Sequence, residues 1–462
     1  MKKSKGGYLV KRKFRILVFL IIFSFVLTAC SNNKKDVGGS DTDKDKGKGP
    51  EEITFTYDSD LEGEITFWTW DGGMWDDIIT EFNKFYPNIE VKKVVVAIGE
   101  MHNNLQTTLT AGSGAPDVSQ VFAPQFPRYQ SAELVEDLLQ APFDAGRFKD
   151  DMSDHAWNRW MSPDGEKLLG MPWNITPLVW FYREDIYESV GLPSDPEELG
   201  EFLQDPNNVL DAAQTLAAND IYMFEFRDSP AIQYGDSVGY FDSEFNWTRN
   251  TDKMAELLDF VKQGVQIGWG PQMSVLTNDE GKQLLKQGKV ASFPGGINLS
   301  RQIEGVVPEQ AGKWRATRAP IGLNVNMVGS TFIIPKQSEN KEAAWAFVEW
   351  ITRAEEAWKL YADLAVQPMW NHISSLPWFQ EHTNEFLGGQ QELKFYDTLD
   401  DLIPVRNYSR LDNMAWPLFI EKVNESIDKN IDSKTILNQI EENVSKQLQT
   451  EIEKLKQEMA AD

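Results

Sequence analysis

The strictest constraint on the fold is a series of short segments in which apolar residues recur either every second residue, as in a strand, or about every 3.6 residues, as in a helix. Residues 65–70 alternate and are rich in β-branched and aromatic side chains, which predicts a strand. Apolar residues from Trp75 to Tyr86 then recur at helical spacing, and Pro87 ends the predicted helix. Further elements follow at residues 89–96 (strand), 105–110 (helix) and 117–122 (strand). This order predicts a largely parallel sheet that is covered by helices.

The pattern continues with lower contrast towards the carboxyl end. Further elements are expected at residues 178–182, 290–293 and 331–335 (strands) and at residues 254–265, 344–351 and 436–455 (amphipathic helices). From residue 61 onward the chain has roughly 400 residues, which is enough for two large domains. The chain is therefore expected to be α/β through the middle and helical at its end.

The amino end has the pattern of an export signal. Its first residues carry seven basic side chains and no acidic one, and an apolar run from Ile16 to Val26 follows. That run is shorter than the roughly 20 residues that a membrane-spanning helix needs. It ends in Leu27-Thr28-Ala29-Cys30, which resembles a bacterial lipoprotein cleavage site. We expect residues 1–29 to be removed and Cys30 to be lipidated on the outer face of the cell membrane, the alternative being an uncleaved anchor helix.

Composition limits the chemistry that the rest of the chain can perform. Residues 30–60 are predicted to be the lipidated Cys and a flexible linker, because Ser31–Glu52 are rich in Lys, Asp, Gly and Ser. Cys30 is the only Cys of the chain, so the body has no internal disulfide and no Cys nucleophile. The net charge of -26 disfavours nucleic acid and anionic lipid as partners. The four His residues have no metal-ligand spacing, and neither a metal nor another cofactor is expected.

Six segments, in order along the chain, are similar to one family. They are Gly63–Trp70, Glu81–Val91, Ala111–Val118, Gly170–Asp185, Gln287–Ala291 and Glu342–Val348. These segments resemble the first strand, the "EFxKxYPxIEV" passage, the "AxGxxPDV" loop, and the "GxP…xxYNKD", "xGKAAM" and "EAAxxFV" motifs of that family. The family is that of the extracellular solute-binding proteins of the maltose-binding-protein type, the capture subunits of ABC importers. Arg183 and Val290 depart from its pattern, at positions that are not expected to touch the ligand.

The resemblance implies two discontinuous α/β lobes around a ligand cleft, with a helical carboxyl end. The expected boundaries are residues 61–173 plus 325–372 for the first lobe and 174–324 plus 373–462 for the second. It further implies closure by hinge motion on a carbohydrate, which is delivered to permease subunits without catalysis, and we expect a monomer. The 16 Trp, 12 Tyr and 26 Phe residues favour an oligosaccharide, which offers several sugar rings to stack on. Three alternatives remain: the same fold binding a polyamine or amino-acid derivative, a surface-anchored glycoside hydrolase, and an adhesion or scaffold lipoprotein.

The predicted ligand residues lie mainly where strands end, because open parallel sheets bind ligands outside the carboxyl ends of their strands. Aromatic rings suit the apolar faces of a sugar, and amide or acidic groups suit its hydroxyls. On these grounds we single out Trp68, Trp70, Asp71, Phe122 and Gln125. Trp68 could instead belong to the core, and Asp71 could cap the following helix.

The resemblance adds further candidates. Trp173 and Asn174 fall where the family crosses between lobes, with hinge packing as the alternative. Glu225 and Asp228 fall where the family places acids, with surface charge as the alternative. Trp416 falls where the family has an aromatic plate, with a core position as the alternative. Gly295, Gly296 and Asn298 are expected in a strand-end loop where the backbone could approach a ligand.

Overall fold

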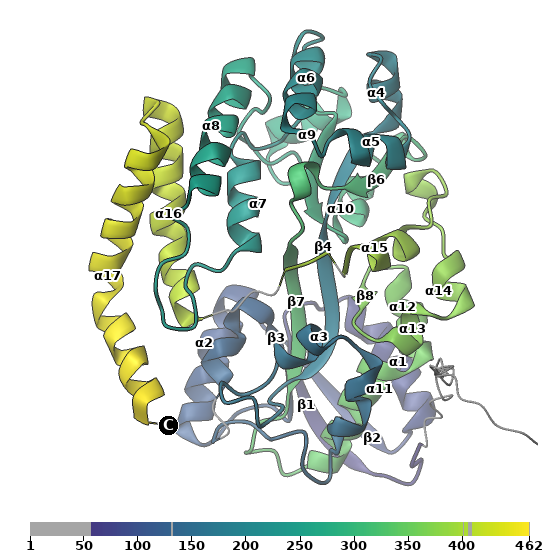
Figure 1. Ribbon diagram of the computed structural model, residues 1–462. Coiled ribbons are helices and arrows are strands. Elements are labelled where there is room, and N and C mark those ends of the chain that lie inside the picture. The colour runs from purple at the N-terminus through teal and green to yellow at the C-terminus, as the bar shows by residue number, and fades with distance from the viewer. Residues whose placement is uncertain (1–56, 131–132, 401, 405–408, 462) are drawn as a thin grey trace, which may run out of the picture. The chain divides into compact units, whose positions relative to one another are not determined.

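The computed structural model describes residues 57–130, 133–400, 402–404 and 409–461 (Figure 1). The predicted signal segment, Cys30 and most of the predicted linker lie outside the described residues. Tyr57 falls within the stretch assigned to the linker, but its ring packs 4.8 Å from the ring of Phe85 and 5.9 Å from that of Tyr86. The folded body therefore includes at least the last part of that stretch.

One sheet organises the described residues. Its strands are β1 (Gly63–Thr69), β2 (Ile89–Val95), β3 (Val118–Phe122), β4 (Met171–Arg183), β5 (Ser292–Gly296), β6 (Trp314–Arg318), β7 (Asn326–Ile333) and β8 (Gln367–Pro368). The strand order is β2-β1-β3-β7-β4-β5, and β6 and β8 also pair with β4. All the strands predicted from the sequence exist, although β4 begins seven residues before the predicted segment.

The expectation of a largely parallel sheet is correct only for its first three strands. β1 is parallel to β2 and to β3. β7 is antiparallel to β3 and β4, and β4 is antiparallel to β5, β6 and β8. The sequence pattern misled because β4 and β7 are buried on both faces, and continuous apolar runs do not reveal strand direction.

The helices surround this sheet and make up most of the rest. In the amino-terminal half they are α1 (Met74–Phe85), α2 (Ile98–Ala111), η1 (Ala123–Tyr129), η2 (Ala145–Asp151), α3 (Asp154–Asn158), α4 (Glu184–Ser189), α5 (Pro196–Phe202), α6 (Pro206–Ala217) and α7 (Ser229–Ser237). Further along are α8 (Asp252–Ile267), α9 (Asp279–Lys286), α10 (Leu299–Val306), η3 (Pro308–Gln310), η4 (Pro320–Gly322), α11 (Lys341–Arg353), α12 (Glu355–Ala362), α13 (Asn371–Ser374), α14 (Pro377–Glu381), η5 (Glu385–Leu387), α15 (Glu392–Asp400), α16 (Arg410–Lys429) and α17 (Ser433–Ala461). The helices named ηn are 3-10 helices.

Two groups of buried side chains form the interior. The first core joins β1, β2, β3 and β7 to α1, α11 and α12, and centres on Trp75, Phe332 and Phe347. The second core lies among α6, α8, α16 and α17. The first core also takes in side chains between Val275 and Ala316 and between Phe379 and Ile403, which the predicted lobe boundaries assign to the second lobe. Those boundaries remain a prediction.

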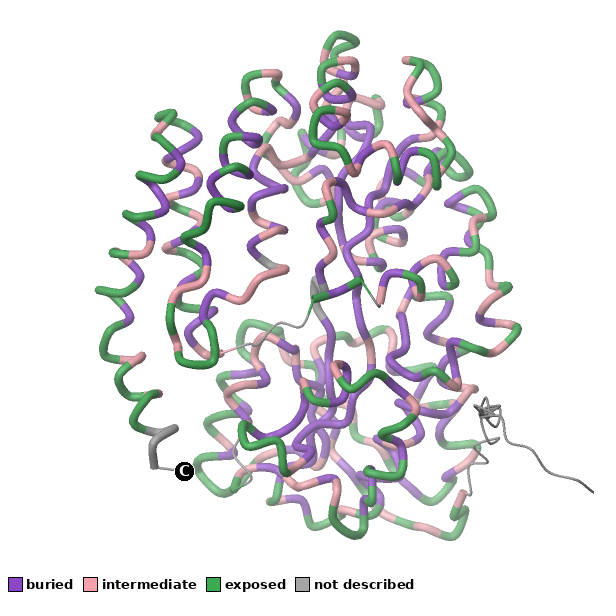
Figure 2. The backbone as a smooth tube through the Cα atoms, in the orientation of Figure 1, coloured by how far each residue is buried: buried purple, intermediate pink, exposed green. Residues whose placement is uncertain are grey.

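Strand β4 contributes to both cores. Along its carboxyl half, Val179 and Phe181 belong to the first core, whereas Trp180 and Tyr182 belong to the second. Alternate side chains of a strand point to opposite faces, so one strand supplies two interiors. Figure 1 shows β4 and β7 running side by side through the middle of the described body, and Figure 2 shows them buried along most of their length.

The last two helices form a long antiparallel pair on one flank of the body (Figure 1). Ser409 and Asp412 make a reciprocal capping box that starts α16, and Asn430, with φ 49°, ends it in the left-handed conformation. α17 buries Ile436, Ile440, Val444 and Leu448, spaced four residues apart. Within the described residues, no helix combines the length and the apolar character that a membrane crossing demands.

Removing the ring of Phe332 should strongly destabilise the fold. Phe332 is fully buried, and its ring lies 5.3 Å from that of Trp173 and 5.6 Å from that of Trp75. Phe332→Ala leaves a cavity that costs about 3–5 kcal/mol of unfolding free energy, measured by urea denaturation. Ile98→Ala, at a side chain that is 45% exposed, is the control and should change that free energy by less than about 0.5 kcal/mol. Equal effects of the two changes would contradict this account of the first core.

Candidate ligand-binding site

An aromatic group gathers where β1 and β3 end. The ring of Trp70 lies 6.1 Å from the ring of Phe122, edge to face, and 6.1 Å from the imidazole of His102. Trp70 and Phe122 are half-buried, so part of each ring is open to solvent. Trp68, on the same face of β1, is also half-buried and packs against the first core. The strand-end argument therefore brings Trp70 and Phe122 together as predicted.

His102 was not singled out by the sequence analysis, yet its buried imidazole packs near the ring of Trp70. It is 4% exposed, and its Nδ1 lies 3.1 Å from the hydroxyl of Tyr129. That hydroxyl donates to the carbonyl oxygen of His102, so Nδ1 must be the donor in the other bond. Burial, assisted by the charge of Arg128, lowers the pKa of His102 to about 4. The imidazole is therefore neutral, and it shares the buried face of α2 with Leu105 and Leu109.

Gln125 lies in η1, directly after β3. Its Oε1 is buried and has no hydrogen-bond partner among the described residues. The carbonyl oxygen of the neighbouring Pro124 accepts a hydrogen bond of 3.2 Å from Nδ2 of Asn413 in α16. This bond brings the first turn of α16 against η1. Trp416, 37% exposed, and Met414, 44% exposed, stand on the same helix.

Asp71 accepts backbone hydrogen bonds at the start of α1, although the N-cap position itself is Gly73. Its Oδ1 accepts hydrogen bonds from the backbone nitrogens of Gly73 (3.0 Å) and Met74 (3.3 Å), at the start of α1. The alternative given for Asp71 from the sequence therefore accounts for its position, and its role in ligand binding remains a prediction.

Trp173 and Asn174 lie in β4 where its pairing with β7 is irregular. Trp173 is 3% exposed and packs among Trp75, Phe332 and Tyr361, which is the packing role given as the alternative. Asn174 Oδ1 accepts a hydrogen bond of 2.8 Å from the nitrogen of Ser330. A Cβ at Gly329 would lie 2.7 Å from the carbonyl oxygen of Asn174, so only Gly fits opposite it.

The two predicted acids are already engaged within the protein. Asp228 is 5% exposed, and its carboxylate accepts hydrogen bonds from Gln272 (3.3 Å) and Asn424 (3.0 Å). Glu225 is half-buried, and its Oε2 accepts a hydrogen bond of 3.1 Å from the nitrogen of Val275. Burial outweighs that bond and raises the pKa of Glu225 to about 7.

Gly295 and Gly296 belong to β5, so the expectation of a loop at these positions is wrong. Pro294, which follows the strand predicted at residues 290–293, pairs with Trp180 inside β5. β5 ends the strand order, and an edge strand tolerates a residue without a donor. A Cβ at Gly295 would lie 2.3 Å from Leu299 Cδ2, so this Gly makes room for α10. Asn298 is the residue that precedes α10.

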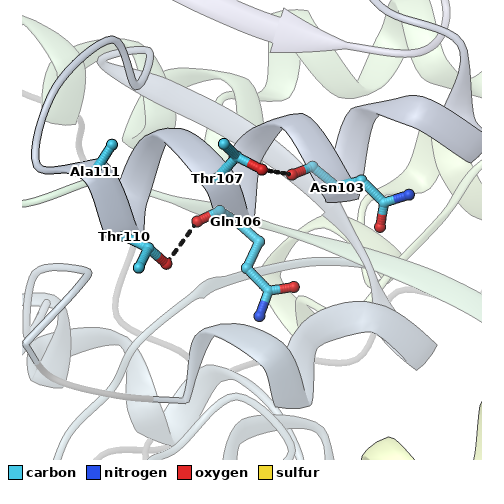
Figure 3. A pocket seen from close by; sticks show the side chains of 5 residues that line it. All are labelled: Asn103, Gln106, Thr107, Thr110 and Ala111. Atoms are coloured by element: carbon cyan, nitrogen blue, oxygen red, sulfur yellow. Dashed lines mark hydrogen bonds between the residues drawn. The ribbon is translucent and has the colours of Figure 1, made fainter.

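A separate hollow of about 590 Å³ lies on the outer face of α2 (Figure 3). Its wall consists of Asn103, Gln106, Thr107, Thr110 and Ala111, none of them predicted for the site. The hydroxyls of Thr107 and Thr110 donate to backbone carbonyls of the same helix. These uncharged groups include no aromatic ring, so we favour the strand-end group as the ligand site.

The comparison that decides the family covers more than half of the chain. Residues 71–358 match the sequence profile of the family described as "Bacterial extracellular solute-binding protein". The chain belongs to this family. The family consists of binding proteins that act outside the cytoplasm, in agreement with the resemblance found in the sequence.

Curated relatives and solved structures agree with this assignment. An arabinooligosaccharide-binding protein of Bacillus subtilis is 24% identical over 84% of this chain and 88% of its own, and one of Halalkalibacterium halodurans is 25% identical over 72% and 77%. The fold is also that of the sugar-binding protein MalE from Xanthomonas citri, with a TM-score of 0.68, 19% identity, and coverage of 84% of this chain and 98% of that one. This likeness shows that the solute-binding protein has the maltose-binding type of fold.

Neutralising Glu225 should stabilise this solute-binding protein in alkaline solution. A free Glu has a pKa of about 4.5, and Glu225 in the folded protein has a pKa of about 7. The contribution of protonated Glu225 to the unfolding free energy is therefore fully present below about pH 4.5 and is lost as the pH rises through about 7. Glu225→Gln keeps an acceptor for Val275 and avoids the buried charge. We expect it to raise the unfolding free energy at about pH 8 by about 1–3 kcal/mol and to leave it unchanged near pH 4.

The measurement is urea denaturation across this pH range. Glu62→Gln, at an exposed carboxylate, serves as the control and should show no such pH-dependent gain. If Glu225→Gln gives the same small change at every pH, Glu225 is ionised in the folded protein without cost, and the account above is wrong.

Proposed function

We propose that this solute-binding protein captures a neutral oligosaccharide outside the cell and delivers it to the membrane subunits of an ABC importer. The observation that carries the proposal is the aromatic group of Trp70 and Phe122. Gln125, which follows Phe122 by three residues in the chain, adds a buried amide oxygen without a partner among the described residues. Aromatic faces suit the C–H faces of sugar rings, and a sugar hydroxyl would satisfy a buried oxygen that otherwise costs free energy. The names of the two curated relatives, both binders of arabino-oligosaccharides, support this ligand class.

The charge state of the site argues against a cationic ligand such as a polyamine. A polyamine needs carboxylates that are ionised and free to pair with it. Asp71 accepts backbone hydrogen bonds at the start of α1, and Asp228 is satisfied by two amide groups. Glu225 has a pKa near 7 and already accepts a hydrogen bond from the backbone. Asp228 and Glu225 therefore already have partners within the protein, and Asp71 uses one carboxylate oxygen on the backbone at α1, so we favour a neutral ligand.

Closure around the ligand is the second part of the proposal. We place the hinge where β4 and β7 pair irregularly, around Asn174 and Gly329. The Asn413–Pro124 hydrogen bond joins α16 to η1 beside Trp416, so we infer that this contact forms as the two sides approach. Ligand that touches both sides would favour the closed form by its additional contacts there. This mechanism requires no catalysis, and we propose that the protein performs none.

Attachment to the membrane is the third part. Cys30 follows a basic and apolar segment that matches an export signal, and we propose that lipid on Cys30 holds the protein at the outer face of the cell membrane. The polar linker that follows would keep the folded body in solution near the importer.

Trp70→Ala should weaken ligand binding without unfolding the protein. A ring that stacks on the ligand contributes about 0.5–1.5 kcal/mol beyond area burial, so we expect affinity for arabino-oligosaccharides to fall about two- to tenfold. The measurement is a titration followed by tryptophan fluorescence and by the shift in melting temperature. Trp378→Ala is the matched control, because Trp378 is half-buried in α14 and packs on Phe379.

Three outcomes would contradict the proposed function. Saturation by spermidine but by no oligosaccharide would assign a cationic ligand. Shortening of an added oligosaccharide would assign an enzyme. The absence of any ligand-induced change in radius of gyration by small-angle scattering would remove hinge closure. A ligand present at a hundred times its dissociation constant should add about 2.7 kcal/mol of stability, which sets the size of the thermal shift.

Cys30→Ser should release the protein from the membrane. The variant keeps the apolar segment but lacks the thiol that carries the lipid, so we expect it in the culture medium or in the soluble extracellular fraction. Immunoblotting of membrane and soluble fractions measures the distribution. Ser31→Ala, at the next position, is the control and should remain with the membrane. A Cys30→Ser variant that stays fully membrane-bound would favour the uncleaved anchor helix.

A further inference from the structure

A proline interrupts the hydrogen bonds inside α16. Pro417 has no backbone N–H, so it cannot donate to the carbonyl oxygen of Asn413, four residues earlier, and its ring crowds that oxygen. In α5, α6, α7 and α14 a proline stands at the first or second position, where the nitrogen has no partner within the helix. Packing does not account for Pro417, because its side chain is exposed. α16 therefore has a place in its interior where it bends more easily than a regular helix.

The part of α16 that follows Pro417 is fastened by side chains. Nδ2 of Asn424 donates a hydrogen bond of 3.0 Å to Oδ2 of Asp228, which is 5% exposed. Oδ1 of Asp428 lies 2.5 Å from Nη2 of Arg227. Asn424 and Asp428 are four residues apart on one face of the helix, so both bonds join it to the same short segment at the start of α7. This part of α16 is therefore held in a fixed rotation.

The part of α16 that precedes Pro417 has contacts on two sides. We refer to residues 410–416 as the leading segment. Its Leu411 and Ala415 are fully buried in the second core. On another face, Nδ2 of Asn413 donates a hydrogen bond of 3.2 Å to the carbonyl oxygen of Pro124 in η1. The apolar contacts keep the leading segment against the body, and a small tilt at Pro417 leaves them in place.

Trp416 is the last residue of the leading segment and directly precedes Pro417. It is 37% exposed, which leaves much of its ring available for contact. Trp416 and Asn413 are three residues apart and so lie on the same side of the helix, the side on which Asn413 meets η1. η1 directly follows Phe122 and contains Gln125. A tilt at Pro417 therefore moves the ring of Trp416 relative to the predicted ligand residues at the end of β3.

We propose that Pro417 is a positioning residue, because it lets the leading segment tilt against the fastened remainder of α16 so that Trp416 packs on the ligand while Asn413 keeps its bond to η1. An uninterrupted helix would hold the ring of Trp416 at the one angle that Asn424 and Asp428 dictate. The missing hydrogen bond at Pro417 removes that restriction at the residue next to the ring. The ligand contact of Trp416 rests on the proposed function, whereas the pivot at Pro417 does not.

The first test needs no ligand and compares the wild type with Pro417→Ala by hydrogen–deuterium exchange. The variant regains an N–H at residue 417, and Ala is favoured in a helix interior, so the leading segment opens less often. We expect the backbone amides of residues 414–416 to exchange about tenfold more slowly in the variant, and those of residues 421–429 to change less. Equal exchange of residues 414–416 in the two proteins would overturn the pivot.

The second test measures affinity for arabinotriose by calorimetric titration, together with the melting temperature. Pro417→Ala should weaken binding about two- to tenfold, the range expected for a ring contact, although its melting temperature is at least that of the wild type. A purely structural role would move affinity and melting temperature in the same direction. Pro206→Ala is the matched control, because Pro206 is exposed and stands at the start of α6, and it should leave affinity unchanged.

A double-mutant cycle shows whether Pro417 acts through the ring of Trp416. In a Trp416→Ala background, Pro417→Ala should have no further effect on affinity, because the ring that it positions is gone. A loss of affinity that persists in that background, or an unchanged affinity of Pro417→Ala alone, would overturn the positioning role and leave the proposed function standing. If the wild type binds no oligosaccharide, the proposed function fails, and the exchange measurement decides on the pivot.

Discussion

The structure depends on one long strand. β4 pairs with four other strands and is buried along almost all of its 13 residues, with alternate side chains in two different cores. A buried strand must satisfy its backbone groups by pairing, so β5, β6, β7 and β8 are positioned by β4. The irregular pairing at Pro172–Pro177 is the point at which this otherwise stiff strand departs from regular geometry. The residues that we propose as the hinge, Asn174 and Gly329, lie in this stretch.

The predicted site combines partly exposed aromatic rings with carboxylates that already accept hydrogen bonds within the protein. Trp70 and Phe122 present rings, while the neutral imidazole of His102 supports them without adding charge. The carboxylates of Asp71 and Asp228 spend their hydrogen bonds on the protein. Such an arrangement selects for shape and hydroxyl placement over charge.

Much of the fold could be predicted from the sequence, because hydrophobic periodicity and the Pro and Gly residues that end helices and strands are local signals. The alternation in β1, the helical spacing of α1 and the stop at Pro87 all correspond to elements in the structure. Strand direction could not be predicted, since β4 and β7 are buried on both faces and their sequences carry no mark of orientation. Gly295 and Gly296 were wrongly placed in a loop, because a strand that contains Pro294 is tolerated only at an edge of the sheet, and edge position is a property of the whole sheet.

The site was predictable to a similar extent. The strand-end argument placed Trp70 beside Phe122, because the ends of adjacent parallel strands meet at one edge. His102 was missed because a single histidine on the apolar face of a helix belongs to no motif that would identify its hydrogen-bond partner. That partner, Tyr129, lies 27 residues further along the chain. The packing of Trp173 and the partners of Asp228 depend on Tyr361 and Asn424, which no local pattern connects to them.

The interleaving of the chain between its two interiors affects how the protein can be made. Buried side chains of the first core extend from Ile65 to Ile403, and those of the second from Trp180 to Leu448. A nascent chain therefore cannot complete either interior until most of its length has left the ribosome. Contacts over such distances form slowly, since long loops must close first. The emerging polypeptide accordingly cannot complete its final fold until late in its synthesis.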